Sequence, residues 1–370
     1  MRPPRSLLRR ISRFLLVLVV GLVLLFGVAY LRSNNDCPLP GAAVPEPAMT
    51  AVIQCDFGSP EVLRVATLAR PVPTDSQVLV RVRAASVNPA DWHAMRGEPY
   101  LARFSMGWRK PATIRFGTDF AGTVEALGTA VTTLRIGDSV FGARTGALAQ
   151  YLTVGATRIA AMPPGASFEQ AAAMPVAAVT ALQGVRDHGG VRSGHKVLIN
   201  GASGGVGTYA VQIAKSLGAT VTGVSSTRNL DLVRSIGADH VIDYTTTDFT
   251  QGAERYDVII DNVGNHSLSS MARMLEPGGT YVIVGGRSGR WLAPMPRAGA
   301  AVLRSKLGGP AMRFFIAQIT ASDLAILRDL MGSGRMTSVI DSTYPLDRVR
   351  DAVAYLESGR ARGKVIVTIE

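Results

Sequence analysis

The sequence predicts an α/β fold in which a β-rich, barrel-like domain is followed by a doubly wound parallel sheet. Three observations support this fold class. A glycine-rich turn joins a strand to a helix within residues 196–218, strand and helix patterns alternate after this turn, and short strands separated by glycines come before it. A chain of 370 residues is long enough to form two such domains.

Residues 196–218 are the centre of this prediction. The apolar run at 197–199 is typical of a strand that is buried on both faces of a parallel sheet. Apolar residues recur at helical spacing from Val206 onward, and Gly218 is a natural helix stop. The turn between strand and helix contains Gly201, Gly204, Gly205 and Gly207. Side chains in so tight a turn would collide with a bound ligand, which explains the glycines.

The glycine turn predicts a dinucleotide site. A helix that begins there directs free N–H groups and the positive end of its dipole toward the turn, which suits a pyrophosphate. The glycines at 201, 204 and 207 are spaced one residue wider at the start than in the usual G-x-G-x-x-G motif. A glycine-rich loop without a ligand is the alternative, and the strand and helix on either side favour the site over it.

The residues after the next strand favour NADPH over NADH. An NAD-selective site carries Asp or Glu at the end of this strand, where it binds the ribose 2′-hydroxyl. Here the strand at 220–224 is followed by Ser225, Ser226, Thr227 and Arg228. Hydroxyl groups and a guanidinium suit a 2′-phosphate, which no carboxylate would repel. The alternative is that Arg228 is a solvated residue at a helix start.

Composition argues against nucleic-acid and metal partners. Lys and Arg number 39 against 27 Asp and Glu, a formal net charge of +12, but five of the arginines lie within the first 13 residues. No stripe of basic residues interleaved with aromatic ones, as on a nucleic-acid surface, stands out. Cys37 and Cys55 are too few for a disulfide framework or a four-ligand zinc site. The five histidines lack the spacing of metal ligands, so we expect no metal.

The first 49 residues form a region of their own. Residues 1–13 are a basic arm, and residues 14–31 carry no charge, so that a helix of this stretch would be ~27 Å long. This length predicts a single-pass membrane anchor, with a signal peptide as the alternative because small residues at 27–29 would permit cleavage. The arginines before the span indicate a cytoplasmic N-terminus, whereas NADPH is a cytosolic cofactor, so the side of the catalytic domain stays open. Residues 32–49 are predicted to be a proline-rich linker.

The order of strands and helices separates two domains. Strands are predicted at 61–65, 78–83, 122–124, 138–140, 152–154, 197–199, 220–224, 240–242, 256–260, 281–284 and 364–369. Helices are predicted at 168–173, 176–185, 206–217, 298–307 and 322–331. No helix follows the last strand, which is free to return to the first domain.

Seven sequence motifs resemble those of a known protein family. They are ASVNPADW (85–92), GTDFAGTVEALG (117–128), PVAAVTAL (175–182), NGASGGVG (200–207), GADHVIDY (237–244), DVIIDNVG (257–264) and ARGKVIVTI (361–369). Together they resemble the medium-chain dehydrogenase/reductase superfamily, in particular its zinc-free quinone oxidoreductase branch. The resemblance covers residues 50–370. It implies a GroES-like catalytic domain at 50–174 and 316–370, and a Rossmann dinucleotide-binding domain at 175–315.

The resemblance also implies hydride transfer without a metal. Zinc-dependent members of the superfamily place a metal-binding Cys near the motif that here reads Asn88-Pro89-Ala90-Asp91, and no Cys follows Cys55 in this chain.

Roles for individual residues follow from the same resemblance. The pyrophosphate would lie on Ser203, Gly204, Gly205, Val206 and Gly207. The 2′-phosphate would be held by Ser225 and Arg228, and the adenosine end would meet Tyr244. The nicotinamide side would be formed by Asn262, Val263, Gly285 and Gly286, with Thr180 and Lys364 over its ribose.

Residues of the catalytic domain would complete the site. Asn88 and Asp91 would lie at the substrate mouth. Tyr100 would donate a proton, as in enoyl reductases that carry a Tyr shortly after the glycine matching Gly97. The alternatives are Asp91 as a helix cap, Tyr244 as ordinary core, Lys364 as an exposed strand residue and solvent as the proton source.

These observations predict a zinc-independent, NADPH-dependent oxidoreductase that transfers hydride to a quinone, an enone or a related activated alkene or carbonyl. The alternative is a membrane-attached dinucleotide-binding scaffold or sensor without turnover. Apolar side chains between residues 287 and 315 favour a small hydrophobic substrate. A homodimer is implied by the resemblance alone.

Overall fold

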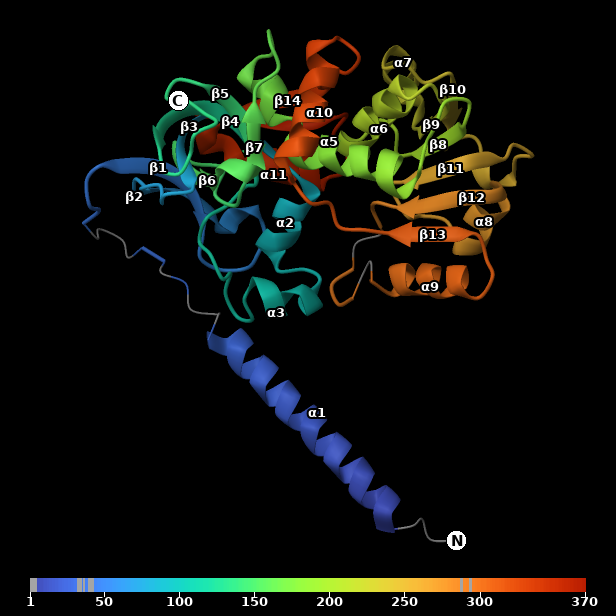
Figure 1. Ribbon diagram of the computed structural model, residues 1–370, viewed down its shortest axis with the longest axis horizontal. Coiled ribbons are helices and arrows are strands. Elements are labelled where there is room, and N and C mark those ends of the chain that lie inside the picture. The colour runs from blue at the N-terminus through green and yellow to red at the C-terminus, as the bar shows by residue number, and fades with distance from the viewer. Residues whose placement is uncertain (1–4, 32–34, 36, 39–42, 287–288, 293–294) are drawn as a thin grey trace.

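Two sheets, one mainly antiparallel and one parallel, form the body of the molecule (Figure 1). The computed structural model describes residues 5–31, 35, 37–38, 43–286, 289–292 and 295–370. Helix α5 (Pro175–Leu182) packs on the first sheet and helix α6 (Gly205–Ser216) on the second, and the two helices pack on each other between the sheets. One continuous apolar core therefore spans both sheets, from Phe141 to Ile199.

The first sheet has the strand order β14-β15-β3-β4-β5-β7, with β6 paired to β3. Its strands are β3 (Gln77–Val87), β4 (Asp119–Leu127), β5 (Ser139–Ala143), β6 (Tyr151–Gly155), β7 (Ile159–Ala161), β14 (Ile340–Pro345) and β15 (Lys364–Thr368). A separate antiparallel pair joins β1 (Ala48–Gln54) to β2 (Leu63–Ala69). The last strand, β15, pairs antiparallel with β3, so the chain does return to its first domain as the sequence predicts.

The second sheet is parallel throughout and has the order β10-β9-β8-β11-β12-β13. Its strands are β8 (Lys196–Asn200), β9 (Thr220–Ser225), β10 (His240–Asp243), β11 (Tyr256–Asp261), β12 (Leu275–Ile283) and β13 (Ala311–Phe314). The chain runs outward from β8 in one direction and resumes at β11 on its other side. Ligands of doubly wound sheets bind at such a reversal, beyond the carboxyl ends of the strands.

The remaining helices lie around these sheets. They are α2 (Pro89–Arg96), α3 (Arg103–Met106), α4 (Phe168–Ala172), α7 (Leu230–Ser235), α8 (Leu268–Arg273), α9 (Met295–Lys306), α10 (Ala321–Gly332) and α11 (Val349–Glu357). Helix α2 begins with a capping box, because the Asn88 N–H donates to the Asp91 carboxylate at 2.8 Å. This cap fixes the first turn of α2, where Pro89 lies.

The predicted elements differ from the observed ones in two respects. The strand predicted at 61–65 starts only at Leu63, because Pro60 opens a 3-10 turn that includes Glu61 and Val62. Among the helices, α2, α3, α7, α8 and α11 have no counterpart in the prediction, and among the strands β1, β7, β13 and β14 have none. The apolar runs of these strands are short, and a short apolar run is compatible with a helix as well as with a strand.

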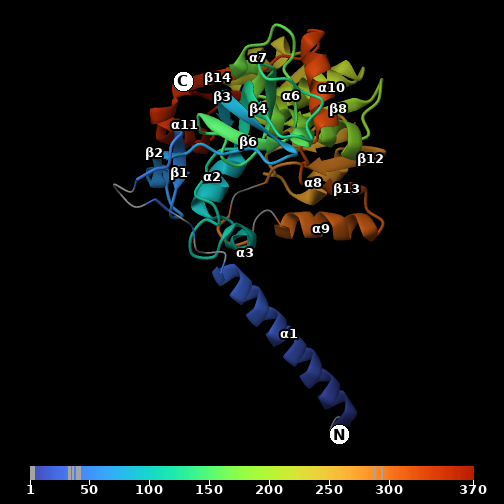
Figure 2. The same cartoon turned by 60° about the vertical axis from the view of Figure 1, so that its left-hand side comes forward.

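Helix α1 (Arg5–Leu31) extends away from both sheets (Figures 1 and 2). Near its C-terminal end the ring of Phe26 packs edge-on against Phe104 and Trp108, with centroids 5.7 and 5.0 Å apart. The prediction of a membrane anchor is wrong. Within the described residues, none of the helices combines the length and the hydropathy needed to cross a bilayer, which takes about 20 predominantly apolar residues. Parts of the predicted basic arm and linker, 1–4, 32–34, 36 and 39–42, lie outside the described residues.

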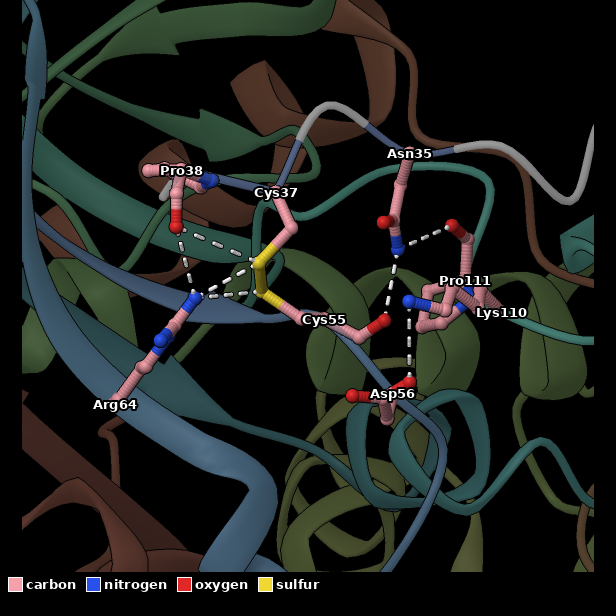
Figure 3. The surroundings of a disulfide bond; sticks show 8 residues. All are labelled: Asn35, Cys37, Pro38, Cys55, Asp56, Arg64, Lys110 and Pro111. Carbon is pink, nitrogen blue, oxygen red and sulfur yellow. Dashed lines mark hydrogen bonds and ion pairs between the residues drawn. A yellow bond between two sulfur atoms is a disulfide. The ribbon is translucent and has the colours of Figure 1, made fainter. Parts of the chain in front are cut away.

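A disulfide joins Cys37 to Cys55, the residue after β1 (Figure 3). The Arg64 guanidinium donates to both sulfur atoms, at 2.8 and 3.0 Å. The amide of Asn35 donates to the carbonyl oxygens of Cys55 and Pro111, at 2.9 and 3.1 Å. The chain just after α1 is thus fixed to the β-rich domain. Two cysteines are too few for a disulfide framework or a four-ligand zinc site, and their number alone does not reveal this single bond.

Candidate active site

A cavity of about 650 Å³ lies at the carboxyl ends of β8, β9 and β11, where the order of the sheet reverses. We call it the glycine-turn cavity. It brings together ten of the predicted cofactor-binding residues: Ser203, Gly204, Gly205, Val206, Gly207, Ser225, Arg228, Tyr244, Asn262 and Val263. It also has lining residues that the sequence analysis does not predict, among them Asn200, Ser226, Asn229, Asn265, Gly359 and Gly363.

The glycine turn has the geometry that a close ligand requires. Gly201 has φ +77°, and a Cβ on Gly207 would lie 2.0 Å from the Gly201 carbonyl oxygen, so neither position accepts a side chain. Gly204 is the N-cap of α6, which begins at Gly205. The free N–H groups and the dipole of this twelve-residue helix therefore point into the cavity, as a pyrophosphate needs.

Two buried amide oxygens in the cavity wall have no partner among the described residues. They belong to Asn229 and Asn262. The Asn262 amide donates to the Asn200 carbonyl oxygen at 2.9 Å, and the Asn229 amide donates to the Ser203 hydroxyl at 3.0 Å. Each side chain is therefore held by its nitrogen while its oxygen stays free. A buried acceptor without a partner is costly, so these oxygens suit the hydroxyl or amide donors of a nucleotide.

The end of the cavity after β9 is neutral or positive. Arg228 donates from Nη2 to the Arg360 carbonyl oxygen at 2.8 Å, and Ser225, Ser226 and Tyr244 lie beside it. No Asp or Glu lines the cavity in the described part of the chain. The lining thus fits a phosphorylated dinucleotide on chemical grounds.

A buried polar cluster lies where β15 meets the first turn of α2. The Lys364 ammonium donates to Asn88 Oδ1 at 2.6 Å and lies 3.6 Å from Asp119 Oδ2, and Asn88 donates in turn to this carboxylate at 2.9 Å. Lys364 and Asp119 are 3% and 0% exposed, so Lys364 is not an exposed strand residue. Burial lowers the pKa of Lys364 and raises the pKa of Asp119. A Cβ on Gly205 would lie 3.3 Å from Lys364 Cδ, which places the cluster against the glycine turn.

Asp91 faces a second cavity, of about 280 Å³, on the other side of α2. Pro89 lines the glycine-turn cavity, whereas Ala90 and Asp91 line the second one, so the first turn of α2 lies between them. The Thr118 hydroxyl donates to Asp91 Oδ1 at 2.6 Å. Burial raises the pKa of Asp91 to about 6, against the lowering effect of this hydrogen bond.

The other predicted residues lie outside the lining of both cavities. The Thr180 hydroxyl donates to the Val176 carbonyl oxygen in its own helix at 2.7 Å. The N–H of Gly285 donates to the Asp261 carbonyl oxygen at 3.1 Å, and Gly286 follows it. The Tyr100 N–H donates to the Arg290 carbonyl oxygen at 2.6 Å, and its ring is edge-on to Trp291 with centroids 5.1 Å apart. Their predicted roles remain predictions.

Comparisons with known proteins agree with this geometry. The family model described as alcohol dehydrogenase GroES-like domain matches residues 74–184, and the model described as zinc-binding dehydrogenase matches residues 236–367. A 2-methylene-furan-3-one reductase of Solanum lycopersicum is 34% identical over 334 residues, which cover 86% of this chain and 79% of that protein. The chain belongs to the medium-chain dehydrogenase/reductase superfamily, in its quinone oxidoreductase-like branch.

Other members of this superfamily show the same extent of similarity. The NADPH-dependent alkenal/one oxidoreductase, chloroplastic, of Arabidopsis thaliana is 32% identical over 345 residues, 88% of this chain and 81% of that protein. The solved structure of the quinone oxidoreductase from Coxiella burnetii has a TM-score of 0.77 at 29% identity and covers 87% of this chain and 100% of its own. The relatives are oxidoreductases, and the chain is an enzyme of their family.

Proposed function

We propose that this protein is an NADPH-dependent reductase of activated alkenes, enones or quinones that works without zinc. The observation that carries the proposal is the glycine-turn cavity. It joins a helix N-terminus, two unpartnered amide oxygens and Arg228 in one lining that contains no carboxylate. The names of the relatives, which include an alkenal/one oxidoreductase and a furanone reductase, support the substrate class.

The selection of NADPH rests on the end of the cavity after β9. Arg228 and the hydroxyls of Ser225 and Ser226 would hold the 2′-phosphate, and Tyr244 would lie at the adenosine end. The phosphates between the two nucleosides would lie on Gly204 and Gly205 at the start of α6. Asn262 and Val263 would lie toward the nicotinamide. Bound there, the cofactor would supply the hydride.

The donor set around Asn88 does not fit a catalytic zinc ion. Cys37 and Cys55 are joined to each other, so neither sulfur is a thiolate ligand. The Asn88 oxygen accepts a hydrogen bond from the Lys364 ammonium, and a cation at this place opposes a metal ion. We derive no step through zinc. The polar cluster of Asn88, Asp119 and Lys364 holds α2 and β15 in register beside the glycine turn instead.

The substrate would approach from the second cavity, and the chain offers two candidate acids, Asp91 in the lining of this cavity and Tyr100 outside it. Asp91 retains its proton at mildly acidic pH because its pKa is about 6. Tyr100, the donor that the resemblance implies, lies at the contact with Trp291. The Tyr100→Phe variant distinguishes them: if Tyr100 donates the proton, kcat falls at least ~tenfold, and if it does not, kcat is unchanged.

The test uses the full chain and proceeds in two steps in one cuvette. NADPH and NADH are titrated with detection by cofactor fluorescence, and a quinone and an enone are then added in turn. We expect NADPH to bind more tightly than NADH and to be oxidised after a substrate is added. If NADPH binds but is not oxidised with any substrate of a broad panel, the protein is a dinucleotide-binding scaffold and not a reductase. If neither cofactor binds, the proposed cofactor site is wrong.

A further inference from the structure

The second cavity has one positive end that the proposed function does not use. Its described lining comes from β1 and the segment after it, from α2 and α3, and from the loops around residues 111–118 and 145. The residues are Gln54, Phe57, Ala90, Asp91, Ala94, Ser105, Met106, Pro111, Ala112, Thr113, Arg115, Phe116, Gly117, Thr118 and Thr145. We call it the Arg115 cavity. Arg115 is its one basic lining residue and Asp91 its one acidic lining residue in the described chain.

Arg115 and its neighbour Arg144 have no carboxylate partner. Within the described residues, no Asp or Glu oxygen lies within 4.0 Å of either guanidinium, although many other arginines of the chain form such pairs. Neither guanidinium forms a hydrogen bond to the described chain. Partial burial and the charge of Arg144 lower the pKa of Arg115, so the two like charges lie close enough to repel each other. Such a pair is stabilised when an anion binds between or beside its members.

The fold holds Arg115 in place rather than leaving it on a flexible arm. Its backbone forms a bridge to Ile53 in β1, and its N–H donates to the Thr113 hydroxyl oxygen at 3.2 Å. Its aliphatic stem lies against Gly146, where an added Cβ would be 3.2 Å from both Cβ and Cδ of Arg115. Gly146 also has φ +98°, which favours glycine. The side chain therefore reaches the cavity along a defined path.

Hydroxyl groups surround the same end. The Thr113 hydroxyl accepts the Arg115 N–H, so its own proton remains free to donate. The Thr145 hydroxyl has no partner in the described part of the chain. Thr118, in contrast, already donates to Asp91. Donors thus gather near Arg115, and the acid lies with α2 beside the glycine-turn cavity.

We propose that the Arg115 cavity binds the anionic tail of the substrate, a carboxylate or phosphate group joined through a hydrocarbon chain to the activated alkene or quinone. Arg115 receives the anion, with Thr113 and Thr145 as further donors and Arg144 adding positive charge. Phe57, Met106 and Phe116 contact the hydrocarbon part. The Asp91 carboxylate would repel the anionic tail and therefore disfavours the reverse orientation of the substrate, with the tail toward α2. The assignment rests on the proposed function, because it assumes that α2 lies between the substrate and the cofactor.

The test compares substrates that differ only in the charge of the tail. Enones with short, medium and long hydrocarbon tails that end in a carboxylate are assayed beside their methyl esters, and phosphate-ended tails beside their neutral alcohols. Wild type is compared with Arg115→Gln, Arg115→Lys and Arg144→Gln. Arg135→Gln is the control, since Arg135 is exposed on the loop before β5 and loses the same charge. Equilibrium binding of the saturated tail compounds is measured in parallel.

For at least one charged tail, Arg115→Gln is expected to lower kcat/KM roughly ten- to a hundredfold, with the neutral partner changed less than about threefold. Arg115→Lys should recover part of this loss, Arg144→Gln should show a smaller one, and Arg135→Gln none. Whichever tail depends more strongly on Arg115 identifies the anion.

Equal effects on charged and neutral tails would overturn the anion site and leave the reductase intact. If wild type reduces neither partner, the reductase fails, and the anion site then stands or falls on whether Arg115→Gln abolishes binding of the saturated acids.

Discussion

Asp91 shows how one residue combines a structural and a chemical role. Its carboxylate caps α2 through the Asn88 N–H and accepts from Thr118, yet it is 5% exposed and its pKa rises to about 6 because burial outweighs both hydrogen bonds. The carboxyls of Asp91 and Asp119 and the ammonium of Lys364 influence one another in this region. A raised pKa means that the folded state binds the Asp91 proton more tightly than the unfolded chain does.

This shift predicts a stability change with a definite sign. The stability that the protonated Asp91 contributes is fully present below pH 3.8 and declines as the pH rises to about 6. Above that pH the ionised carboxylate lowers the free energy of unfolding by a constant amount of about 3 kcal/mol. Asp91→Asn keeps the size and one acceptor but removes the charge. We expect it to match wild type near pH 4 and to raise the free energy of unfolding by roughly 1–3 kcal/mol above pH 6. Urea unfolding across this range measures the difference, and parallel curves for the two proteins would refute it.

Arg228 is the residue that we expect to discriminate NADPH from NADH. Arg228→Glu should weaken NADPH roughly ten- to a hundredfold and NADH far less, because the new carboxylate repels only the 2′-phosphate. Titration by cofactor fluorescence measures both affinities. Arg192→Glu is the matched control, because Arg192 is exposed in the loop before β8, at the strand end opposite the glycine turn. An equal loss for both cofactors would show that Arg228 does not discriminate between them.

The sequence predicts the site residues that share one local segment. The residues from Ser203 to Gly207 follow from a strand, a turn and a helix in immediate succession. Asn200 and Asn265 come together only because β8 and β11 pair in parallel register, with Asn200 opposite Asp261, and their amide groups then bond at 3.1 Å. No local pattern contains that pairing. Arg115 escapes prediction for the same reason, since its neighbours come from β1, α2 and a distant glycine.

At the scale of elements, a single covalent bond and a few hydrogen bonds determine how the segment after α1 is attached. The disulfide joins Cys37 to Cys55, which are 18 positions apart in the sequence, and Lys110 and Asp56 form an ion pair at 3.6 Å beside it (Figure 3). Cys55 directly follows Gln54, which lines the Arg115 cavity, and the Asn35 amide joins Cys55 to Pro111, which lines it as well. The attachment therefore also supports one side of this cavity.

Removing the bond tests its contribution to stability. The double variant Cys37→Ser, Cys55→Ser should lose about 2–3 kcal/mol of unfolding free energy, as expected for a closed loop of this length. Wild type treated with a thiol reductant should lose the same amount, and the double variant should not respond to the reductant. Denaturant unfolding with and without reductant provides all the comparisons. A wild type that is insensitive to reductant while fully reduced would show that the bond adds no stability.

At the scale of the whole molecule, the segment from Arg360 to Lys364 joins the two sheets. Arg360 accepts from Arg228, Gly363 donates to the Ser203 carbonyl oxygen at 2.9 Å, and Lys364 continues into β15 and the buried cluster. Both sides of the glycine-turn cavity therefore depend on one short stretch near the C-terminus. The sequence predicts the return of the last strand but not this contact, because it depends on the distance between two separately formed sheets.

Gly363 is the residue that allows this close approach. It has φ +95°, and an added Cβ would lie 2.3 Å from the Val339 carbonyl oxygen. Gly363→Ala should therefore displace the segment, lower the free energy of unfolding by roughly 2–4 kcal/mol and weaken NADPH binding severalfold. Gly359→Ala is the control: this residue also lines the cavity with a positive φ, but its Cβ meets no atom within 4 Å, so only the backbone cost of about 1 kcal/mol applies. If both variants lose the same stability and neither loses cofactor affinity, the segment from Arg360 to Lys364 does not couple the two sheets to the site.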